Sequence, residues 1–430
     1  MNYQIKEAAA ATGLTDAEIK DMLAVYLSGK AKPAKVLIIP PDITRMNSYA
    51  GPVTRMLCEL LSDAAIDVMP ALGTHIPMTP EEMDRMYAGV PHSCFKVHNW
   101  REDVEHIGDV PESFVREVSG GLYGQAVRVE INRRLLDKSY DMIFSVGQVV
   151  PHEVVGMANY NKNVFVGCGG SSFIHGSHFL GAVYGMENMM GRDLTPVHRV
   201  FDYAEEHFCR DLPLTYILTV TAPNAFGPNV RSLAIGRDRD MFSDSIRVSQ
   251  KYNLNFLDKP LRKVVAYLDP EEFHTTWLGN KSIYRTRMAI ADGGDLLVIG
   301  PGIHRFGEDL QNDRLIRKYG YVGREKILAA VEDPLNEDLR GSLSVAAHLI
   351  HGSSDGRFRI TYSPGHLTQE EVEGVGFDYM PLDQALAAYD VSALQPGENS
   401  VNGEEIYFVP NPALGLWADR NRFDKAAPGK

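Results

Sequence analysis

The feature that most constrains the fold of this chain is a series of short apolar runs, separated by stretches with helical patterning. Six such runs come before residue 225: Lys35–Pro40, Ile66–Pro70, Val127–Ile131, Asp141–Val146, Asn163–Gly167 and Pro213–Thr221. Continuous apolar runs are typical of strands that are buried on both faces, as in a parallel sheet covered by helices. The sequence therefore predicts an α/β fold.

A second series of runs follows in the last third of the chain. Its members are Lys263–Leu268, Asp295–Gly300, Arg357–Ser363 and Ile406–Pro410, with a helix predicted around Thr275–Ala291. Because a domain usually has about 100–200 residues, a chain of 430 residues is expected to contain two domains. We predict α/β domains at residues 1–265 and 266–430, both with mostly parallel sheets.

Charge and hydropathy exclude two classes of partner. The chain has 43 Lys and Arg against 56 Asp and Glu, a formal charge of −13, and its basic residues are scattered. A protein that binds a phosphate backbone gathers its basic residues, so nucleic acid is not expected as a partner. No apolar stretch approaches the ~18 residues that span a bilayer, and the N-terminus lacks a basic region followed by an apolar core. We expect a cytoplasmic protein that does not bind membranes.

The segment Gly167–Ser172 (GCGGSS) resembles part of a dinucleotide-binding loop. Its sixth position is Ser and no acid follows at the expected distance, so a Rossmann dehydrogenase is not predicted. Gly169 and Gly170 would still leave backbone N–H groups at a helix N-terminus, which suits a phosphate. A tight turn from strand to helix explains the same residues equally well.

His152 lies in a segment, Pro151–Gly156 (PHEVVG), that begins like the helix of a zinc protease. The second ligand would be needed one turn later, where Gly156 stands, so a metalloprotease is excluded. The four cysteines are far apart and form no C-x-x-C pair, which argues against a structural zinc site and a disulfide framework. Taken alone, His152 is either a loop histidine with a structural hydrogen bond or a catalytic base.

Two polar segments directly follow predicted strands. One is Pro41–Arg45 (PDITR), and the other ends at His75. Loops at the carboxyl ends of parallel strands are where α/β proteins bind ligands. Asp42 or Thr44 could cap the next helix, whereas Arg45 could present its planar guanidinium group to a carboxylate or a phosphate.

A lysine and two histidines follow His152 closely. Lys162 lies ten residues beyond His152, and His175 and His178 lie thirteen and sixteen residues beyond Lys162. A lone loop lysine is normally a solvated cation, and histidines at i and i+3 either chelate a metal or form a polar helix face. A base, an amine and an imidazole within 27 residues nevertheless favour a functional site.

Together these segments resemble the nickel-pincer lactate racemase family, which comprises nickel-dependent racemases and epimerases of 2-hydroxy acids. The matching segments are Pro40–Arg45 (PPDITR), Ala71–His75 (ALGTH), Ser145–Gly156 (SVGQVVPHEVVG), Lys162 and His178. The spacing of ten and sixteen residues between His152, Lys162 and His178 makes the resemblance specific. It covers most of residues 35–300 and, more weakly, the remainder.

The resemblance implies a covalently bound cofactor. In that family a lysine is joined through a thioamide to a pyridinium mononucleotide, whose square-planar nickel is held by two sulfurs, a ring carbon and a histidine. By position, Lys162 would carry the nickel-pincer nucleotide and His178 would bind nickel, a metal that imidazole suits. Gly169 and Gly170 would contact the cofactor, and Asp42 and Thr44 would either contact the cofactor or orient a base. Proteins that synthesise the cofactor would be partners.

The resemblance also implies racemisation or epimerisation of a 2-hydroxy acid in a cleft between the domains. A hydride taken to an electron-poor ring and returned to the other face inverts the carbon, and each enantiomer presents its hydroxyl to a different base. His75 and His152 would be the two bases, since imidazole both accepts and donates protons near its pKa of ~6.5. Three residues would bind the substrate: Arg45, Lys281 and Trp277.

Three departures from the family pattern concern the cofactor and the substrate. Where the family has Ser-Gly-Gly before the lysine, this chain has Ala158-Asn159-Tyr160. The family's Arg after Gly-Thr-His is replaced by Ile76, and its Tyr-Gln in the second domain is replaced by Trp277-Leu278. Lactate and larger 2-hydroxy acids, including sugar acids, are therefore open as substrates.

Two alternative functions stay open. One is a hydro-lyase or isomerase that uses a plain divalent ion bound by His175, His178 and a carboxylate such as Glu187. The other is a catalytically inactive protein of the same fold that binds a small molecule. An oligomer is possible in either case.

Overall fold

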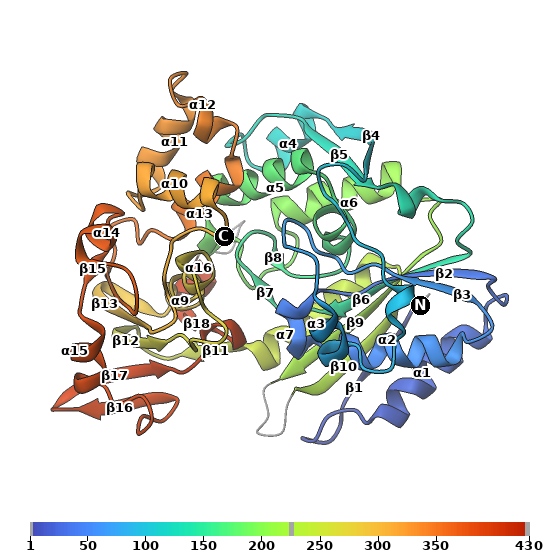
Figure 1. Cartoon of the computed structure of the whole chain (residues 1–430), viewed down its shortest axis with the longest axis horizontal. Coiled ribbons are helices and arrows are strands. Elements are labelled where there is room, and N and C mark those ends of the chain that lie inside the picture. Colours follow the sequence, from blue (N-terminus) through green and yellow to red (C-terminus); the bar gives the residue numbers. More distant parts are fainter. Residues whose placement is uncertain (1–2, 223–227, 426–430) are drawn as a thin grey trace. The chain divides into compact units, whose positions relative to one another are not determined.

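The computed structural model describes residues 3–222 and 228–425, and the chain divides into two compact units (Figure 1). Unit 1 comprises Met1–Ser177 and Met190–Asn253, and unit 2 comprises His178–Met189 and Leu254–Lys430. Both have α/β architecture with mostly parallel sheets, so the predicted fold class is confirmed. The domain limits 1–265 and 266–430 stay a prediction.

Unit 1 is built on a six-stranded sheet with the order β1-β10-β9-β6-β2-β3. Its strands are β1 (Gln4–Glu7), β2 (Lys35–Ile39), β3 (Ala65–Val68), β6 (Met142–Gln148), β9 (Leu214–Ala222) and β10 (Asn229–Gly236). Strands β9, β6, β2 and β3 run parallel, whereas β10 is antiparallel to both of its neighbours. Four of the six predicted runs form these parallel strands.

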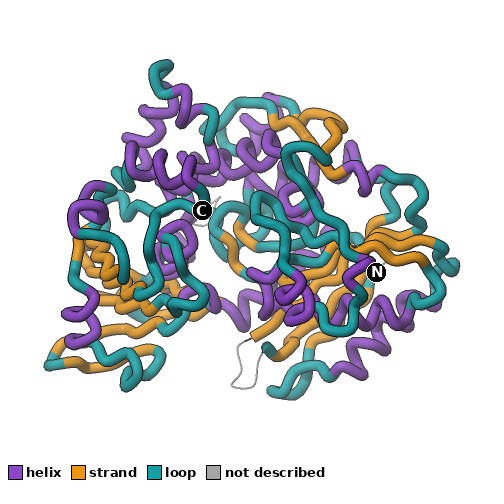
Figure 2. The backbone as a smooth tube through the Cα atoms, in the orientation of Figure 1, coloured by secondary structure: helices purple, strands orange, loops and turns teal. Residues whose placement is uncertain are grey.

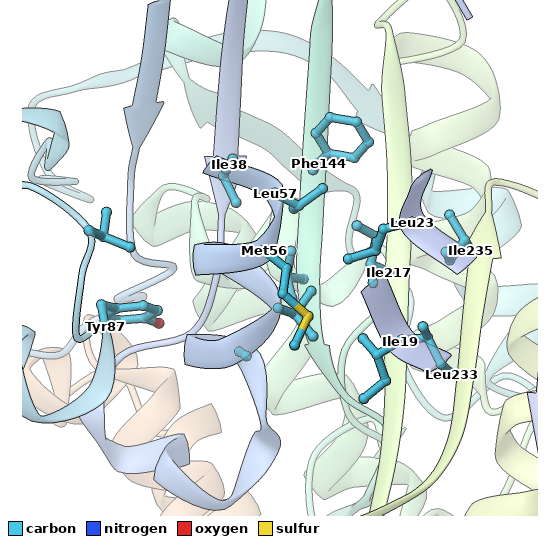
Figure 3. Close-up of a cluster of buried hydrophobic side chains, with 14 of the residues drawn as sticks. Ile19, Leu23, Ile38, Met56, Leu57, Tyr87, Phe144, Ile217, Leu233 and Ile235 are labelled. Carbon is cyan, nitrogen blue, oxygen red and sulfur yellow. The ribbon is translucent and has the colours of Figure 1, made fainter. Parts of the chain in front are cut away.

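Both faces of this sheet are covered, which explains why its strands are apolar throughout. On one face, α1 (Asp16–Ser28) and α2 (Ala50–Leu60) pack into an apolar cluster that includes Ile217 of β9 (Figure 3). On the other face, the ring of Tyr216 lies 4.3 Å from that of Tyr160. Neighbouring residues of β9 therefore point into different cores.

Two predicted strands of unit 1 take other forms. Val127–Ile131 forms β5 (Val127–Asn132) but pairs antiparallel with β4 (Val104–Val110) outside the main sheet, because its sequence VRVEI alternates instead of being apolar throughout. Asn163–Gly167 is not a strand but a π-helical turn, closed by the Cys168 N–H donating to the Asn163 carbonyl at 2.8 Å. Apolar runs of five residues cannot be assigned to strand or helix by pattern alone.

The remaining helices of unit 1, including α5, which crosses its boundary, are α3 (Pro80–Met86), α4 (Glu112–Val118), α5 (Ser171–Tyr184), α6 (Pro196–Phe208) and α7 (Arg239–Asn253). A two-residue ladder, β7 (Pro151–His152) with β8 (Gly156–Met157), bends the chain after β6. The boundary of the two units falls inside α5, between Ser177 and His178.

Unit 2 contains a second sheet, and strands are drawn in orange in Figure 2. The sheet has six strands in the order β15-β14-β13-β12-β17-β16. Its strands are β12 (Leu261–Tyr267), β13 (Ile290–Gly300), β14 (Arg359–Pro364), β15 (Asp378–Tyr379), β16 (Gly397–Val401) and β17 (Glu404–Val409), and β16 is the antiparallel edge. A separate parallel pair is formed by β11 (Leu254–Leu257) and β18 (Leu416–Asp419).

The helices of unit 2 are short. They are α8 (Thr276–Gly279), α9 (Lys281–Thr286), α10 (Leu310–Tyr319), α11 (Arg324–Glu332), α12 (Glu337–Arg340), α13 (Leu343–His351), α14 (Gln369–Gly374), α15 (Leu382–Ala388) and α16 (Arg420–Lys425). The single helix predicted around Thr275–Ala291 is wrong: two short helices meet at Asn280, whose side-chain oxygen accepts a hydrogen bond from Tyr362 at 2.6 Å. Across the residues that the structure describes, no helix combines the length and the apolar character needed to cross a bilayer.

Candidate active site

The predicted site residues of unit 1 gather where three adjacent parallel strands end. Asp42 follows β2, His75 follows β3, and His152 follows β6, and these strands lie side by side in the sheet. Carboxyl ends of parallel strands meet at one edge of a sheet, so the loops that carry these residues are neighbours. The loop before His75 also touches the turn after Lys162, because the Gly73 N–H donates to the Gly167 carbonyl at 2.9 Å.

Asp42 and His75 form a hydrogen-bonded pair. The Nδ1 of His75 lies 2.5 Å from Oδ2 of Asp42, and the other carboxylate oxygen accepts from the backbone N–H and the hydroxyl of Thr44. Burial of Asp42 works to raise its pKa, but the contacts with His75 and Thr44 and the charge of Arg45 outweigh it, so the pKa lies below its ordinary value. Asp42 is therefore an anion that orients His75, whose side chain is 45% exposed.

His152 differs from His75 in that its Nδ1 accepts a hydrogen bond. Its ring is buried, and its Nδ1 accepts the backbone N–H of Val154 at 3.2 Å. This bond assigns the proton of the neutral ring to Nε2, whereas the bond to Asp42 assigns the proton of His75 to Nδ1. Both imidazoles thus present Nε2 to further partners, that of His75 as a proton acceptor and that of His152 as a donor.

Lys162 is partly buried, and its amine is surrounded by charged groups. Burial and the nearby positive charge of Arg45 lower the pKa of Lys162, Glu153 and Asp42 act in the opposite direction, and the net pKa is about 8. With that pKa, roughly a quarter of the amine is neutral at pH 7.5. A neutral amine is a nucleophile, which makes Lys162 suited to covalent attachment.

The backbone before Lys162 is strained. Asn159 and Tyr160 have φ values of +74° and +55°, in the left-handed region that favours glycine. These are the two positions where the sequence carries Asn and Tyr in place of a Gly-Gly pair. The conformation is supported by burial of the Tyr160 ring and by its hydroxyl, which donates to the Arg237 carbonyl at 2.7 Å. Strained residues persist where surrounding structure holds them, often at functional sites.

Gly169 and Gly170 lie at a tight turn before α5, and their N–H groups already have protein partners. The Gly170 N–H donates to the Glu130 carbonyl at 3.1 Å, the Gly169 N–H donates to the Val166 carbonyl at 3.4 Å, and the Ser172 N–H donates to the Glu130 carboxylate at 3.2 Å. A Cβ atom at Gly169 would lie 1.8 Å from the Phe165 carbonyl oxygen. Close packing thus accounts for these glycines, and their contact with a cofactor stays a prediction.

His175 and His178 lie on α5, on either side of the unit boundary. His175 is in unit 1, edge-on to Trp100 with ring centroids 6.4 Å apart, and burial together with the charge of Arg101 lowers its pKa. His178 is the first residue of the part of α5 that groups with unit 2. Its role as a nickel ligand stays a prediction.

The remaining predicted site residues lie in unit 2, Trp277 in α8 and Lys281 at the start of α9. The indole of Trp277 stacks on the buried imidazole of His348, with ring centroids 4.0 Å apart and planes 15° apart. The Nζ of Lys281 lies 5.8 Å from the centre of the Phe273 ring. Within unit 1 the structure therefore brings Asp42, Thr44, Arg45, His75 and Lys162 together, whereas Trp277 and Lys281 belong to unit 2.

Sequence reasoning missed the role of one acidic residue and misplaced another. Glu153 influences Lys162 and lies next to His152, and this adjacency was the available signal. Glu187, a candidate ligand for a divalent ion, instead accepts hydrogen bonds from Arg287 and Arg357. Within residues 3–222 and 228–425, no group of three His, Cys, Asp or Glu is arranged to hold a metal ion.

An Asp–His pair beside a lysine of lowered pKa, at the carboxyl edge of a parallel sheet, is the arrangement expected of an α/β protein that binds a ligand at its strand ends. Residues 25–191 match the family model described as the lactate racemase N-terminal domain. That range contains Arg45, His75, His152, Lys162 and His178. Residues 25–191 are therefore similar to the N-terminal domain of lactate racemases.

Two solved structures share the fold of the whole chain. A protein from Thermotoga maritima is 21% identical with a TM-score of 0.81, over 96% of this chain and 99% of that one. The lactate racemase apoprotein from Thermoanaerobacterium thermosaccharolyticum is 16% identical with a TM-score of 0.66, over 94% of this chain and 89% of that one. Likeness at these identities shows the fold. No curated protein sequence matches the chain.

Proposed function

We propose that this protein racemises or epimerises a 2-hydroxy acid and that it uses a nickel-pincer nucleotide attached to Lys162. The observation that carries the proposal is the Asp42–His75 pair at the same strand edge as a lysine whose pKa is about 8. A proton acceptor and a nucleophilic amine are what the reaction and the cofactor attachment require of the protein.

The two histidines support a proton exchange on opposite sides of the substrate. With Nδ1 bound to Asp42, His75 has Nε2 available to take the proton of the substrate hydroxyl, as in histidines oriented by a carboxylate. His152 carries its proton on Nε2 and returns one to the oxygen of the inverted product. For the other enantiomer the two roles exchange.

The residues proposed to bind the substrate are chosen mainly for a positive charge that matches the substrate carboxylate. Arg45 would bind the substrate carboxylate through its guanidinium fork, and Lys281 and Trp277 would add a cation and an aromatic surface from unit 2. The exposed side chain of Ile76, beside His75, offers no charge to a second anionic group. Both lactate and larger 2-hydroxy acids, including sugar acids, are candidate substrates.

The residues present fit the family's cofactor. The lowered pKa of Lys162 supplies the neutral amine that a thioamide link needs, and the imidazole of His178 is a nitrogen donor that suits nickel. When bound, the nickel nucleotide would supply the hydride acceptor. Proteins that make this nucleotide would be partners of the chain.

The test is to produce the protein with and without the cofactor pathway and to follow inversion of a panel of 2-hydroxy acids and aldonates by chiral chromatography. We expect inversion by the first preparation alone, together with an added mass on the peptide that contains Lys162. Full activity with an unmodified Lys162 would contradict the proposal. Binding of a hydroxy acid without inversion would favour the inactive binding protein instead.

A further inference from the structure

Helix α5 is held at its two ends by different units. At its start, the Ser172 N–H donates to the Glu130 carboxylate at 3.2 Å and the ring of Phe173 lies 5.2 Å from that of Phe165, all within unit 1. The boundary falls after Ser177, so His178 belongs to the half that groups with unit 2. His178 is thus separated from Lys162 by a change of unit within one helix.

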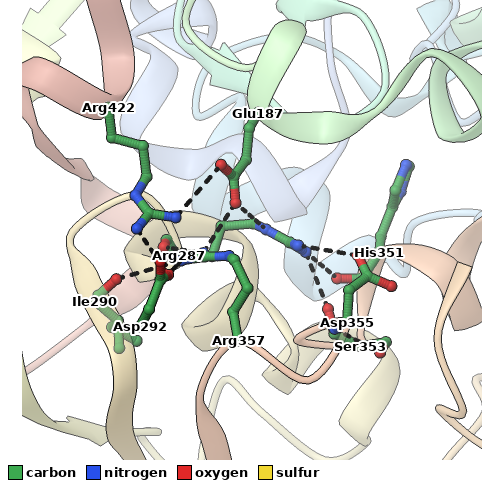
Figure 4. Close-up of polar contacts among 9 residues, drawn as sticks. All are labelled: Glu187, Arg287, Ile290, Asp292, His351, Ser353, Asp355, Arg357 and Arg422. Carbon is green, nitrogen blue, oxygen red and sulfur yellow. Dashed lines mark hydrogen bonds and ion pairs between the residues drawn. The ribbon is translucent and has the colours of Figure 1, made fainter. Parts of the chain in front are cut away.

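The 3₁₀ turn Met186–Asn188, which follows α5 after Gly185, is anchored by a charged cluster around Glu187 (Figure 4). One carboxylate oxygen of Glu187 accepts from Nε of Arg287 at 3.2 Å and from Nη2 of Arg357 at 2.9 Å, and the other lies 3.9 Å from Nη1 of Arg422. Upstream, Arg324 donates to the Val183 carbonyl. Four arginines from separate segments of unit 2 therefore hold residues 183–187.

The principal arginine of this cluster cannot follow Glu187 if it moves. The Arg287 side chain is 6% exposed and also donates to the carbonyls of His351 at 3.2 Å and Ser353 at 3.0 Å. Asp355 lies 3.5 Å from the same guanidinium group. Since Arg287 is fixed by groups other than Glu187, it provides a rigid anchor for the carboxylate.

We propose that Glu187 is a positioning residue for His178. Glu187 locks the turn that follows α5 onto unit 2, next to the last turn of the helix, which Arg324 holds at Val183, and so fixes where the imidazole nine residues earlier is presented. An α-helix is stiff and rises about 1.5 Å per residue, so a shift passed to its last residue, Tyr184, reaches His178 within about two turns. The inference rests on the proposed function, in which His178 binds nickel.

The test uses the full-length protein, produced with the cofactor pathway, and compares wild type with Glu187→Gln. Glutamine keeps the shape and loses the charge that the arginines bind. We expect normal added mass on the Lys162 peptide, roughly tenfold faster loss of nickel to a chelator, and faster hydrogen exchange of residues 183–188. The matched control is Glu404→Gln, which breaks the 2.8 Å pair with Lys263 in the same unit and should leave nickel retention unchanged.

Unchanged nickel retention in Glu187→Gln, with faster exchange of residues 183–188, would overturn the inference and leave the cluster a purely structural anchor. Wild-type protein that has neither modified Lys162 nor nickel would instead refute the proposed function and the inference with it. If Glu187→Gln does not fold, Arg422→Gln removes the 3.9 Å contact with Glu187 and the 2.8 Å bond to Asp292 but leaves Arg287 and Arg357 bound to Glu187, and a smaller acceleration of nickel loss is expected.

Discussion

The two units differ in how their cationic side chains are partnered. In unit 2, the guanidinium group of Arg287 meets two carboxylates and two carbonyls, so every side of the charge has a partner. In unit 1, the amine of Lys162 lies near the like charge of Arg45, and its pKa is about 8. A buried charge with matched partners supports structure, whereas one with a displaced pKa marks a place for chemistry.

The histidines of the two units make the same contrast. His348 in unit 2 has both ring nitrogens engaged, each 2.8 Å from a tyrosine hydroxyl, those of Tyr284 and Tyr321. His75 in unit 1 uses Nδ1 for Asp42, and its side chain is 45% exposed, so Nε2 can meet a substrate. The same side chain is thus a packing element in one unit and a candidate base in the other.

The largest effect is expected from removing the anchor charge in unit 2. Arg287→Met leaves the carboxylates of Glu187 and Asp355 without their buried partner, and the free energy of unfolding should fall by about 3 kcal/mol. Urea unfolding followed by tryptophan fluorescence measures this loss. Arg210→Met, at an exposed 3.5 Å pair with Glu206, should cost less than about 1 kcal/mol. Similar losses in both variants would remove the contrast between the units.

The next largest effect concerns the base of unit 1. Asp42→Asn replaces the anion that orients His75, and kcat for inversion of the best substrate in the panel should fall about 100-fold. Asp137→Asn, at an exposed aspartate bonded to Ser139, is the control and should leave kcat unchanged. An unchanged kcat in Asp42→Asn would show that the pair is structural.

The lowered pKa of Asp42 also predicts how the free energy of unfolding changes with pH. Because this pKa is lowered in the folded protein, its stabilising contribution is present above the unfolded value of ~3.9 and is lost as the pH falls through the folded value. The Asp42→Asn variant should lack this loss in acid unfolding experiments. An identical acid profile in both proteins would contradict the assignment.

A smaller effect is expected from neutralising Lys162 in protein without the cofactor. The folded pKa of about 8 lies below the unfolded value of ~10.4, so wild-type stability should rise with pH between these values, where the unfolded chain binds more protons. Lys162→Met should be more stable at pH 7 by on the order of 1 kcal/mol and should lack that rise. Thermal unfolding at pH 7 and pH 10 measures both. A destabilised variant would show that the lysine charge is well solvated.

The smallest effect separates backbone strain from side-chain chemistry at Asn159. Asn159→Gly should change stability by less than about 0.5 kcal/mol, because glycine takes a positive φ freely but adds freedom to the unfolded chain. Asn159→Ala should lose about 1 kcal/mol, since alanine is strained in the left-handed region. Chemical denaturation compares the two. Equal losses would mean that the Asn159 side chain, and not the backbone, matters.

Much of the site could be predicted from sequence because its residues follow strands that are easy to recognise. The runs before Asp42, His75 and His152 form β2, β3 and β6, and adjacent parallel strands bring their ends together without further information. Lys162 follows His152 by ten residues in the same stretch of chain. The apolar pattern of the strands and the rule that parallel strands share a carboxyl edge were enough to predict these positions.

What could not be predicted depends on pairings between distant residues. Residues 178–189 group with unit 2, where Glu187 meets arginines 100 and 170 positions away, and no local pattern signals such contacts. The left-handed backbone at Tyr160 is held by Tyr216 and Arg237, which are also remote in sequence. The π-helical turn at Asn163–Gly167 has the composition of a strand, so its form depends on the residues around it.

The most direct test of the contrast between the units is the titration of Lys162 in protein made without the cofactor. Competitive labelling with an acylating reagent across a range of pH, read out on the Lys162 peptide by mass spectrometry, gives the pKa of that amine. We expect a midpoint near pH 8. A midpoint near the ordinary lysine value of ~10.4 would contradict it.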